Sequence, residues 1–486
     1  MIKWLKSNLD QAYFFLSATF LVGLTCSKFL MSASLILHAF VFIIVGNYKR
    51  FWERVSQYRF LLLLLVFWGL HALSLMWSQD LDSGWDGVRV RLSIIALPIL
   101  YTGTLTFNLD NTRRWAVLLL LSVFVVIGLN AGHYYWLNQQ NQALDIRQLS
   151  WFGSHIRFGI LVGFSGMFAF LLWRRKNLNS WLFCGYILLI TGYTIFSQTL
   201  SGILSLMVTL TFIVVFFIRK NRFFIGVAAL GLSGLIIGGI ILLKSILTPS
   251  IPCGNFDKIS VVTEEWGKHS TFPLDSLDRK GQPLQRTAER YLCSRQLPLT
   301  EGSIKALLPQ EIMAIENGFT SKQASEGGLL SRIDELKFQL HEAKDPNGHS
   351  LLQRIAYWKT AWAIIKDHPI IGVGIGDVDY AFKIKYKATG STLLPENQRR
   401  SHNLFLTTWL AIGIFGFIGL VLILSWMSWI SIQDGFPLLL AFCIINALTM
   451  LLEDSIETQA GASFFGFFIS ILFSREARKA WTTKIY

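Results

Sequence analysis

The stretch SHNLFLTTWLAIGIFGFIGLVLILS, residues 401–425, marks the point where a long polar segment runs into a hydrophobic span. Its polar start, Ser401-His402-Asn403, precedes a mostly apolar run of the length that a membrane helix needs, about 20 residues. The polar segment before it covers residues 248–401, and most of the remaining chain is apolar. A histidine at the mouth of a membrane helix, beside a large polar loop, suits chemistry on a substrate with one lipid end and one water-soluble end.

The composition is that of an integral membrane protein, because hydrophobic residues make up 52% of the chain and charged residues only 15%. We therefore expect an all-α polytopic membrane protein with about 12 transmembrane helices. The candidate spans are residues 11–27, 29–46, 60–77, 90–107, 115–131, 157–173, 181–197, 201–218, 223–244, 403–425, 436–452 and 460–474. Residues 1–247 would hold the first nine spans, residues 248–401 one large loop, and residues 402–486 the last three spans and a tail.

The positions of lysine and arginine predict the orientation of these spans. Cations recur in alternate loops, which the positive-inside rule assigns to the cytoplasm. These cations are Lys3, Lys6, Lys49, Arg50, Arg54, Arg59, Arg113, Arg114, Arg174, Arg175, Lys176, Arg219, Lys220, Arg222, Arg475, Arg478, Lys479 and Lys484. Both termini then lie in the cytoplasm and residues 248–401 lie outside it. The net charge of +14 is spread over many loops rather than gathered in one stripe, so we expect no nucleic-acid partner.

The large loop has nearly balanced charges, with 20 Lys and Arg against 18 Asp and Glu between residues 248 and 401. It contains Cys253 and Cys293, which an oxidising compartment would allow to pair, although pairing and two free thiols are both open from sequence. Residues 255–331 show a polar pattern of loops and short helices without a repeat. The shape of this part cannot be derived from the pattern.

The end of the loop is more regular. Apolar residues from Leu351 to Ile365, including Trp358 and Trp362, recur at helical spacing and predict an amphipathic helix that ends before His368-Pro369. Such a helix suits a membrane interface, or it packs on the core of the loop itself. Arg354 projects at the edge of its apolar face, where a guanidinium can hold a phosphate through two hydrogen bonds. The glycines that follow, at 372, 374 and 376, predict a tight turn with positive φ.

His402 is the best candidate for a general base. Ser401 is a possible N-cap, which would place His402 in the first turn of a helix. The positive end of that helix and the preceding Arg399 and Arg400 would favour an uncharged imidazole, the form that a general base requires. In helical projection Gly413 would lie about 20° from His402, with Gly416 close by, and the glycines would form a smooth strip against a neighbouring helix.

The run His402-Asn403, nine further residues, Gly413, two residues and Gly416 resembles the signature of the O-antigen ligase and polymerase superfamily. Members of this superfamily are integral membrane glycosyltransferases of the GT-C type. The order of features is similar too: about twelve spans, one large periplasmic loop, and an arginine-bearing helix followed by a Pro-x-x-Gly-x-Gly turn. The stretch from Glu457 to Gly461 also looks similar to some members.

The resemblance implies an enzyme that transfers a glycan from undecaprenyl pyrophosphate to a sugar hydroxyl of the lipid A core. It implies no metal and no other cofactor. The partners would be the lipid-linked glycan donor, the lipid A-core acceptor and the lipid bilayer. The location would be the bacterial inner membrane, with the large loop in the periplasm.

The resemblance also implies roles for particular residues. The signature histidine corresponds to His402 and the loop arginine to Arg354, which we take as the catalytic residues. A further arginine at an outer span edge matches Arg157 best. Many members carry Ser-Arg at the outer start of a middle span, whereas residues 197–201 here are SQTLS and contain no arginine. The remaining candidates for substrate binding are Arg89, Arg91, Arg400 and Asn403, and Gly413 and Gly416 are structural.

The chemistry and the alternatives follow from these residues. The outer arginines would neutralise a pyrophosphate leaving group, and His402 would deprotonate the acceptor, with inversion at the anomeric carbon. Acidic residues near the outer face would be solvated or would pair with the arginines: Asp80, Asp82, Asp86, Glu453, Asp454 and Glu457.

A polymerase or a protein oligosaccharyltransferase of the same superfamily is the first alternative. A transporter is disfavoured, because the predicted spans carry no acidic residue at their centres, and we expect the intramembrane His38 and His71 to form interhelical hydrogen bonds.

Overall fold

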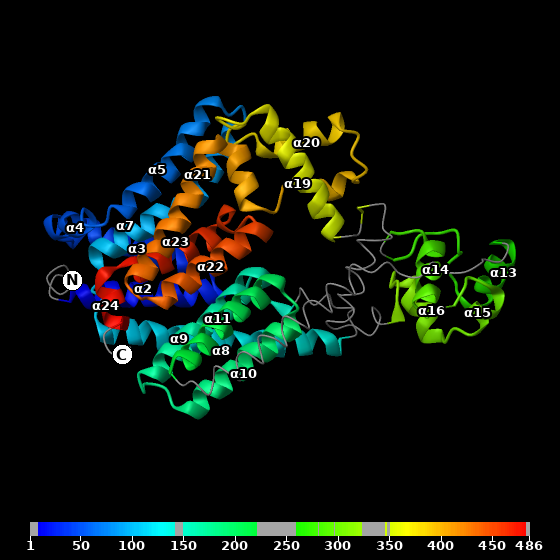
Figure 1. Cartoon of the computed structure of the whole chain (residues 1–486), viewed down its shortest axis with the longest axis horizontal. Coiled ribbons are helices and arrows are strands. Elements are labelled where there is room, and N and C mark those ends of the chain that lie inside the picture. Colours follow the sequence, from blue (N-terminus) through cyan, green and yellow to red (C-terminus); the bar gives the residue numbers. More distant parts are fainter. Residues whose placement is uncertain are drawn as a thin grey trace. The chain divides into compact units, whose positions relative to one another are not determined.

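Long apolar helices dominate the computed structural model of this chain (Figure 1). It describes residues 8–140, 149–220, 259–279, 281–295, 297–322, 346–347 and 350–482. Over these residues the secondary structure is helical, with one isolated β-bridge between Leu277 and Pro283 and no strand. The all-α fold is therefore confirmed for the described part of the chain.

The chain divides into two compact units. The first comprises Met1–Arg222, Trp358–Ala388 and Arg399–Tyr486, and the second comprises Phe223–Tyr357 and Thr389–Gln398. Helix α19 (Ser350–Asp367) crosses this division, so its last ten residues belong to the first unit and its start to the second.

The first unit is a bundle of apolar helices. Its described elements are α2 (Leu9–Cys26), α3 (Lys28–Val45), α4 (Tyr48–Val55), α5 (Phe60–Leu73), η1 (Ser74–Trp77), α6 (Leu81–Arg91), α7 (Ser93–Thr104), α8 (Leu109–Gln139), α9 (His155–Arg174), α10 (Ser180–Ser197), α11 (Leu200–Lys220), α20 (Val378–Ala388), α21 (Leu404–Gln433), α22 (Pro437–Leu452), η4 (Ser455–Glu457), α23 (Gln459–Phe473) and α24 (Arg475–Thr482). Eight described helices are long and apolar enough to cross a membrane, and the two helices α22 and α23 are shorter and apolar.

Four of the predicted spans have no counterpart of membrane-crossing length among the described residues. The predicted spans 436–452 and 460–474 correspond to the shorter helices α22 and α23, and the other two are 90–107 and 223–244. The predicted span 90–107 contains α7, which has 12 residues. At 1.5 Å per residue such a helix is about 18 Å long, which is less than the hydrocarbon thickness of a bilayer. The apolar residues of α7 are buried between other helices instead, and Ile94 and Leu97 are fully enclosed. The predicted span 223–244 lies outside the described residues, so the count of twelve stays a prediction.

Helix α9 lies at the centre of the bundle, and 83% of the residues in its membrane-length stretch are buried. Figure 1 shows it beside α11, and the two helices approach closely because Gly163 faces Ser205 and Leu206. Hydroxyls of α11 donate hydrogen bonds to carbonyls of α9: Ser205 Oγ to Ile160 O and Thr209 Oγ1 to Gly163 O, both at 2.9 Å. Small residues and hydroxyls therefore hold this contact, as in other helix pairs within membranes.

The second unit contains a small helical core whose shape could not be predicted from the sequence pattern. Its described helices are α13 (Ile259–His269), α14 (Leu284–Ser294), α15 (Glu301–Lys305) and α16 (Pro309–Glu316). Trp266, Tyr291 and Ile315 are almost fully buried at the centre of this core. Cys293 is disulfide-bonded, and its predicted partner Cys253 lies outside the described residues. The free thiols of the described part are Cys26, Cys184 and Cys443.

Candidate active site

The segment before α21 differs from the sequence prediction in its cap. The N-cap of α21 is Asn403, whose side chain accepts a hydrogen bond from Leu406 N at 3.2 Å. The predicted cap Ser401 is wrong: its hydroxyl accepts from Asn403 N at 3.1 Å and bonds to Thr407 Oγ1 at 2.6 Å. Both residues are good caps, and the hydroxyl of Ser401 has a better partner one turn into the helix. His402 consequently lies before the helix rather than in its first turn.

His402 is held in a left-handed conformation, with φ at 48°. This region is uncommon for a non-glycine residue and persists only where neighbours hold the chain in place. Two such neighbours come from α19 and α20: Trp358 Nε1 donates to Ser401 O at 3.0 Å, and Tyr386 Oη donates to Arg399 O at 2.8 Å. The predicted apolar face of α19 thus supports the histidine loop, and Trp362 contacts Trp409 of α21 edge to face.

The imidazole of His402 has a carboxylate beside it. Nδ1 lies 3.5 Å from Glu453 Oε2, and the side chain of His402 is 32% exposed. A carboxylate at Nδ1 orients the ring and favours the tautomer with the proton on Nδ1. The lone pair is then on Nε2, which is the nitrogen that a general base uses in this arrangement.

The segment that follows α22, from Glu453 to Glu457, supplies two more carboxylates to this end of the bundle. Asp454 Oδ1 accepts a hydrogen bond from Thr407 Oγ1 at 2.8 Å. Desolvation, and secondarily the negative charge of Glu457, raises the pKa of the Asp454 carboxyl to about 7. Glu457 accepts hydrogen bonds from Arg91 Nη2 and, at 2.9 Å, from Arg400 Nη1.

Arg400 joins this segment to α20. Besides Glu457, it binds both carboxylate oxygens of Asp379, with Nη2 donating to Oδ2 at 2.8 Å and Nε to Oδ1. The hydrogen bonds from Arg400 lower the pKa of Asp379. Arg400 thus stands between two carboxylates, while Arg91 is 5% exposed and buried against Glu457. We name this set, Arg91, Asp379, Arg400, Glu453 and Glu457, the ionic cluster.

The glycine turn after α19 docks on the helix that follows His402. Gly372 and Gly374 have φ of 73° and 97°, as the sequence predicted for a tight turn. Helix α21 breaks at Ile412 and Gly413, and the freed backbone pairs with the turn, Gly374 N donating to Ala411 O and Ile414 N to Pro369 O.

The structure corrects the predicted role of Gly413. With φ at 72°, it forms part of this break, and a Cβ there would lie 1.8 Å from the carbonyl oxygen of Ile370. Because His402 lies outside the helix, a helical projection from it to Gly413 does not apply. Gly413 therefore admits a turn of the chain, not a neighbouring helix, and the side chain of Ile412 fills the space at Gly416.

The opposite side of the same turn docks on the segment before α6. Asp377 accepts three hydrogen bonds from the backbone N–H groups of Gln79 and Asp80, at 2.8 to 3.0 Å. Gly376 N donates to Ser78 Oγ at 3.1 Å. The turn thereby links α21 to the segment that leads to Arg91.

The structure brings some of the predicted site residues together. His402, Asn403, Arg400 and Arg91 lie in or beside the ionic cluster. Arg157, in the first turn of α9, is close enough to Glu453 for their charges to interact. Arg89 lies elsewhere on α6, pairing at 2.9 Å with Asp86 on an exposed face. Arg354 lies in the part of α19 that belongs to the second unit, so the cluster does not include it.

Sequence reasoning missed Glu453, Glu457 and Asp379 as members of the site. It treated the first two as solvated charges or general partners for arginine, and it did not select Asp379. The one available signal was the stretch from Glu457 to Gly461, which looked similar to some superfamily members. Asp379 carries no such signal, because its role depends on where α20 packs.

The fold and this cluster together define a polytopic membrane protein with a histidine, a carboxylate at its Nδ1 and two arginines paired with carboxylates at one end of a helix bundle. Residues 185–421 match the family described as O-antigen ligase, so the predicted resemblance to the O-antigen ligase superfamily is confirmed over this part of the chain. The match contains Arg354, His402, Gly413 and Gly416 and ends before Glu453. No curated protein matches the chain.

Members of this family are glycosyltransferase-like enzymes that act on glycans. The apolar helices and the family together indicate a multi-pass bacterial membrane protein.

Proposed function

We propose that this protein is an O-antigen ligase that transfers a glycan from undecaprenyl pyrophosphate to a sugar hydroxyl of the lipid A core at the periplasmic face of the inner membrane. The observation that carries the proposal is His402, whose Nδ1 faces Glu453 at 3.5 Å beside two arginines of the ionic cluster. A base and several cations are what attack on a lipid-linked pyrophosphate requires.

In the proposed step, Nε2 of His402 accepts the proton of the acceptor hydroxyl while the acceptor oxygen attacks the anomeric carbon. The bond from that carbon to the pyrophosphate oxygen breaks, and the electron pair leaves with the polyprenyl pyrophosphate. Direct displacement inverts the configuration at the anomeric carbon. Glu453 stabilises the imidazolium that forms, and arginines neutralise the charge that develops on the leaving group.

The arginines take different parts in this proposal. Arg91 and Arg400 already bind carboxylates, so their first effect is to hold Glu457 and the histidine loop in position. Arg400 can bind substrate only where an anionic substrate replaces Asp379 as its partner. Asn403 caps α21 and thereby holds His402. Arg354 and Arg157 remain candidates for the pyrophosphate, whereas Arg89 is exposed and paired with Asp86, so we assign it no part in the reaction.

The test is transfer by the purified full-length protein from a lipid-linked glycan donor to lipid A-core. Replacing His402 by Ala should lower the rate by about 10² to 10⁴, the range that a general base contributes. His402→Gln, which keeps polarity and size, should fail equally. Normal transfer by either variant would remove His402 as the base. Wild-type protein that transfers nothing would overturn the proposed activity.

A second measurement separates the ligase from its alternatives. In cells that lack this protein, a ligase predicts that long glycan is missing from the lipid A core and accumulates on the lipid carrier. A polymerase predicts a core with a single repeat and no long chains. An unchanged pattern would point to a protein acceptor or to transport. Of the two intramembrane histidines, His38 forms the predicted interhelical hydrogen bond, from Nε2 to Thr104 Oγ1 of α7 at 2.8 Å. The prediction is wrong for His71, whose Nδ1 bonds to Phe67 O of its own helix α5 at 2.9 Å.

A further inference from the structure

A second basic feature lies beside the ionic cluster, in a cavity that none of the assignments above explains. It opens between the α2–α3 corner, the start of α9 and the start of α23, and its lining includes Lys28, Arg157 and Ala460. Hydroxyls of Ser27 and Ser154 also line it. We call it the basic cavity. All of its lining residues belong to the first unit.

Two cations border this cavity without an anion. Lys28 and Arg157 form no hydrogen bond or ion pair through their side chains with any residue that the structure describes. No Asp or Glu is among the described lining residues. The carboxylate of Glu453, which also faces His402, is close enough to Arg157 for their charges to interact. The basic cavity is therefore an electropositive space next to the proposed base.

Three of the helices around the cavity add to its positive potential, whereas α2 contributes its C-terminal end, which carries a partial negative charge. Helix α3 begins at Lys28, α9 begins at His155 and α23 begins at Gln459, so three helices direct their N-terminal ends to this region. None of them carries an acidic residue in its first turn, and the side chain of Ser154 forms no capping hydrogen bond with α9. Helix N-termini attract anions through their backbone N–H groups and partial positive charge. With Lys28 and Arg157 present, the favoured ligand is a phosphate.

Part of the lining is apolar and lies at the edge of a lipid-facing surface. Leu24, Met31 and Phe158 line the cavity. The next residue of α3, Phe29, is 78% exposed, as expected for a side chain that faces lipid. A ligand with a phosphate end and a hydrocarbon tail fits both properties, because its charged end meets the cations and its tail can continue into the bilayer.

We propose that the basic cavity binds the pyrophosphate of the lipid-linked donor, with Lys28 and Arg157 as its cationic ligands. This inference rests on the proposed function and adds Lys28, which sequence reasoning did not select. It also assigns Arg157 to the donor rather than to the acceptor. The pyrophosphate is then held near Glu453, which also faces His402.

The experiment measures binding, not transfer, so the two proposals can fail separately. Purified full-length protein in detergent is titrated with radiolabelled farnesyl pyrophosphate, and farnesol serves as the probe that lacks the pyrophosphate. Lys28→Gln and Arg157→Gln should each weaken binding by about tenfold, the usual effect of losing one charge-assisted contact. Arg157→Lys should retain part of the affinity, because it keeps the charge and loses the planar fork.

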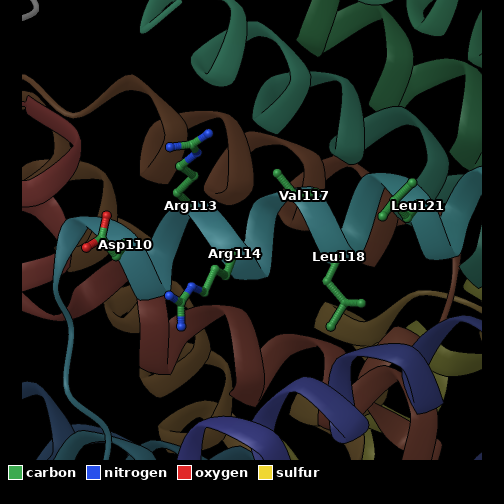
Figure 2. Close-up of a pocket in the computed structure, with 6 residues that line it drawn as sticks. All are labelled: Asp110, Arg113, Arg114, Val117, Leu118 and Leu121. Carbon is green, nitrogen blue, oxygen red and sulfur yellow. The ribbon is translucent and has the colours of Figure 1, made fainter. Parts of the chain in front are cut away.

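A matched control comes from a second cavity of the first unit, which also contains arginines. Figure 2 shows this cavity at the start of α8, which is lined by Asp110, Arg113, Arg114, Val117, Leu118 and Leu121. Arg113→Gln should leave farnesyl pyrophosphate binding unchanged. Gel filtration and melting temperature establish that each variant is folded, and Arg157→Lys provides a milder variant should Arg157→Gln not fold.

Three results would overturn the proposal. The first is wild-type affinity in both Lys28→Gln and Arg157→Gln. The second is equal affinity for farnesol and farnesyl pyrophosphate. The third is displacement of the probe by phosphatidylglycerol vesicles at equal lipid concentration, which would make the cavity a general phospholipid site. If these variants lose binding while the wild-type protein transfers no glycan, the cavity stands and the proposed ligase activity does not.

Discussion

The ionic cluster and the basic cavity lie next to each other and use their cations differently. Arg91 and Arg400 share the carboxylate of Glu457, and their side chains are 5% and 34% exposed. Lys28 and Arg157 border a cavity that has no acidic residue in its described lining. A cation with a built-in carboxylate stabilises the fold, whereas a cation without one can receive an anion from a substrate. Whether a cation already has a carboxylate partner, rather than the number of arginines, therefore distinguishes structural from substrate-binding residues in this protein.

The largest effect on stability should come from Glu457, because two cations depend on it. Glu457→Gln would leave Arg91 buried without its carboxylate and remove one partner of Arg400. Breaking a buried ion pair from one side typically costs about 3–5 kcal/mol. Thermal unfolding of the purified protein in detergent should show this loss.

A suitable control is Glu396→Gln, since Glu396 is exposed in η3 (Pro395–Asn397). Equal melting temperatures for the Glu457 and Glu396 variants would contradict the structural role of the ionic cluster.

Substitution of Arg157 should have the opposite effect: it should weaken substrate binding strongly and change the stability of the protein little. Arg157→Gln removes no ion pair among the described residues, so the melting temperature should stay close to that of the wild type. The KM for a lipid-linked donor should rise by about tenfold as a charge-assisted contact is lost. A variant with unchanged KM and reduced stability would place Arg157 with the structural cations.

Asp454 is not a member of the ionic cluster but interacts with the charges of Glu457 and Arg400, so it offers a pH test at this site. Desolvation raises its pKa in the folded state to about 7, well above the value of an exposed aspartate. The folded protein then binds a proton that the unfolded chain releases, so stability from this group falls as pH rises from about 4 to about 7 and is level above that.

Asp454→Asn keeps an acceptor for Thr407 and removes the titration. Melting temperatures recorded from pH 4 to pH 8 should decline less with pH in the variant than in the wild type. Identical slopes would mean that Asp454 is ionised throughout this range.

The parts of this protein that sequence could predict are those that depend on local pattern. Apolar runs of membrane length located eight helices that are long enough to cross a bilayer, and the spacing of Trp358 and Trp362 located α19. The positive φ of Gly372 and Gly374 also follows from the residue type. The apolar run at 90–107 did not distinguish α7 from a membrane-spanning helix, because a short helix that is buried by its neighbours is as apolar as one that faces lipid.

The partners in the site could not be predicted, because they depend on packing. Arg91 and Glu457 are 366 positions apart in the chain, and nothing near either residue indicates the other. The local sequence also could not predict whether Ser401 or Asn403 is the N-cap of α21. Ser401 has Thr407 as an alternative partner, and that contact exists only once α21 has formed.

The smallest effect should come from Arg89, which the sequence ranked with Arg91. Both lie in the last turn of α6, but the side chains of Arg89 and its partner Asp86 are 77% and 71% exposed. Exposed pairs of this kind contribute little to stability, because water and salt screen them. Arg89→Gln should therefore leave the melting temperature and the transfer rate within experimental error, while Arg91→Gln destabilises the protein. A loss of transfer in Arg89→Gln, with normal stability, would show that an exposed cation of α6 contacts substrate and that pairing is not a sufficient criterion.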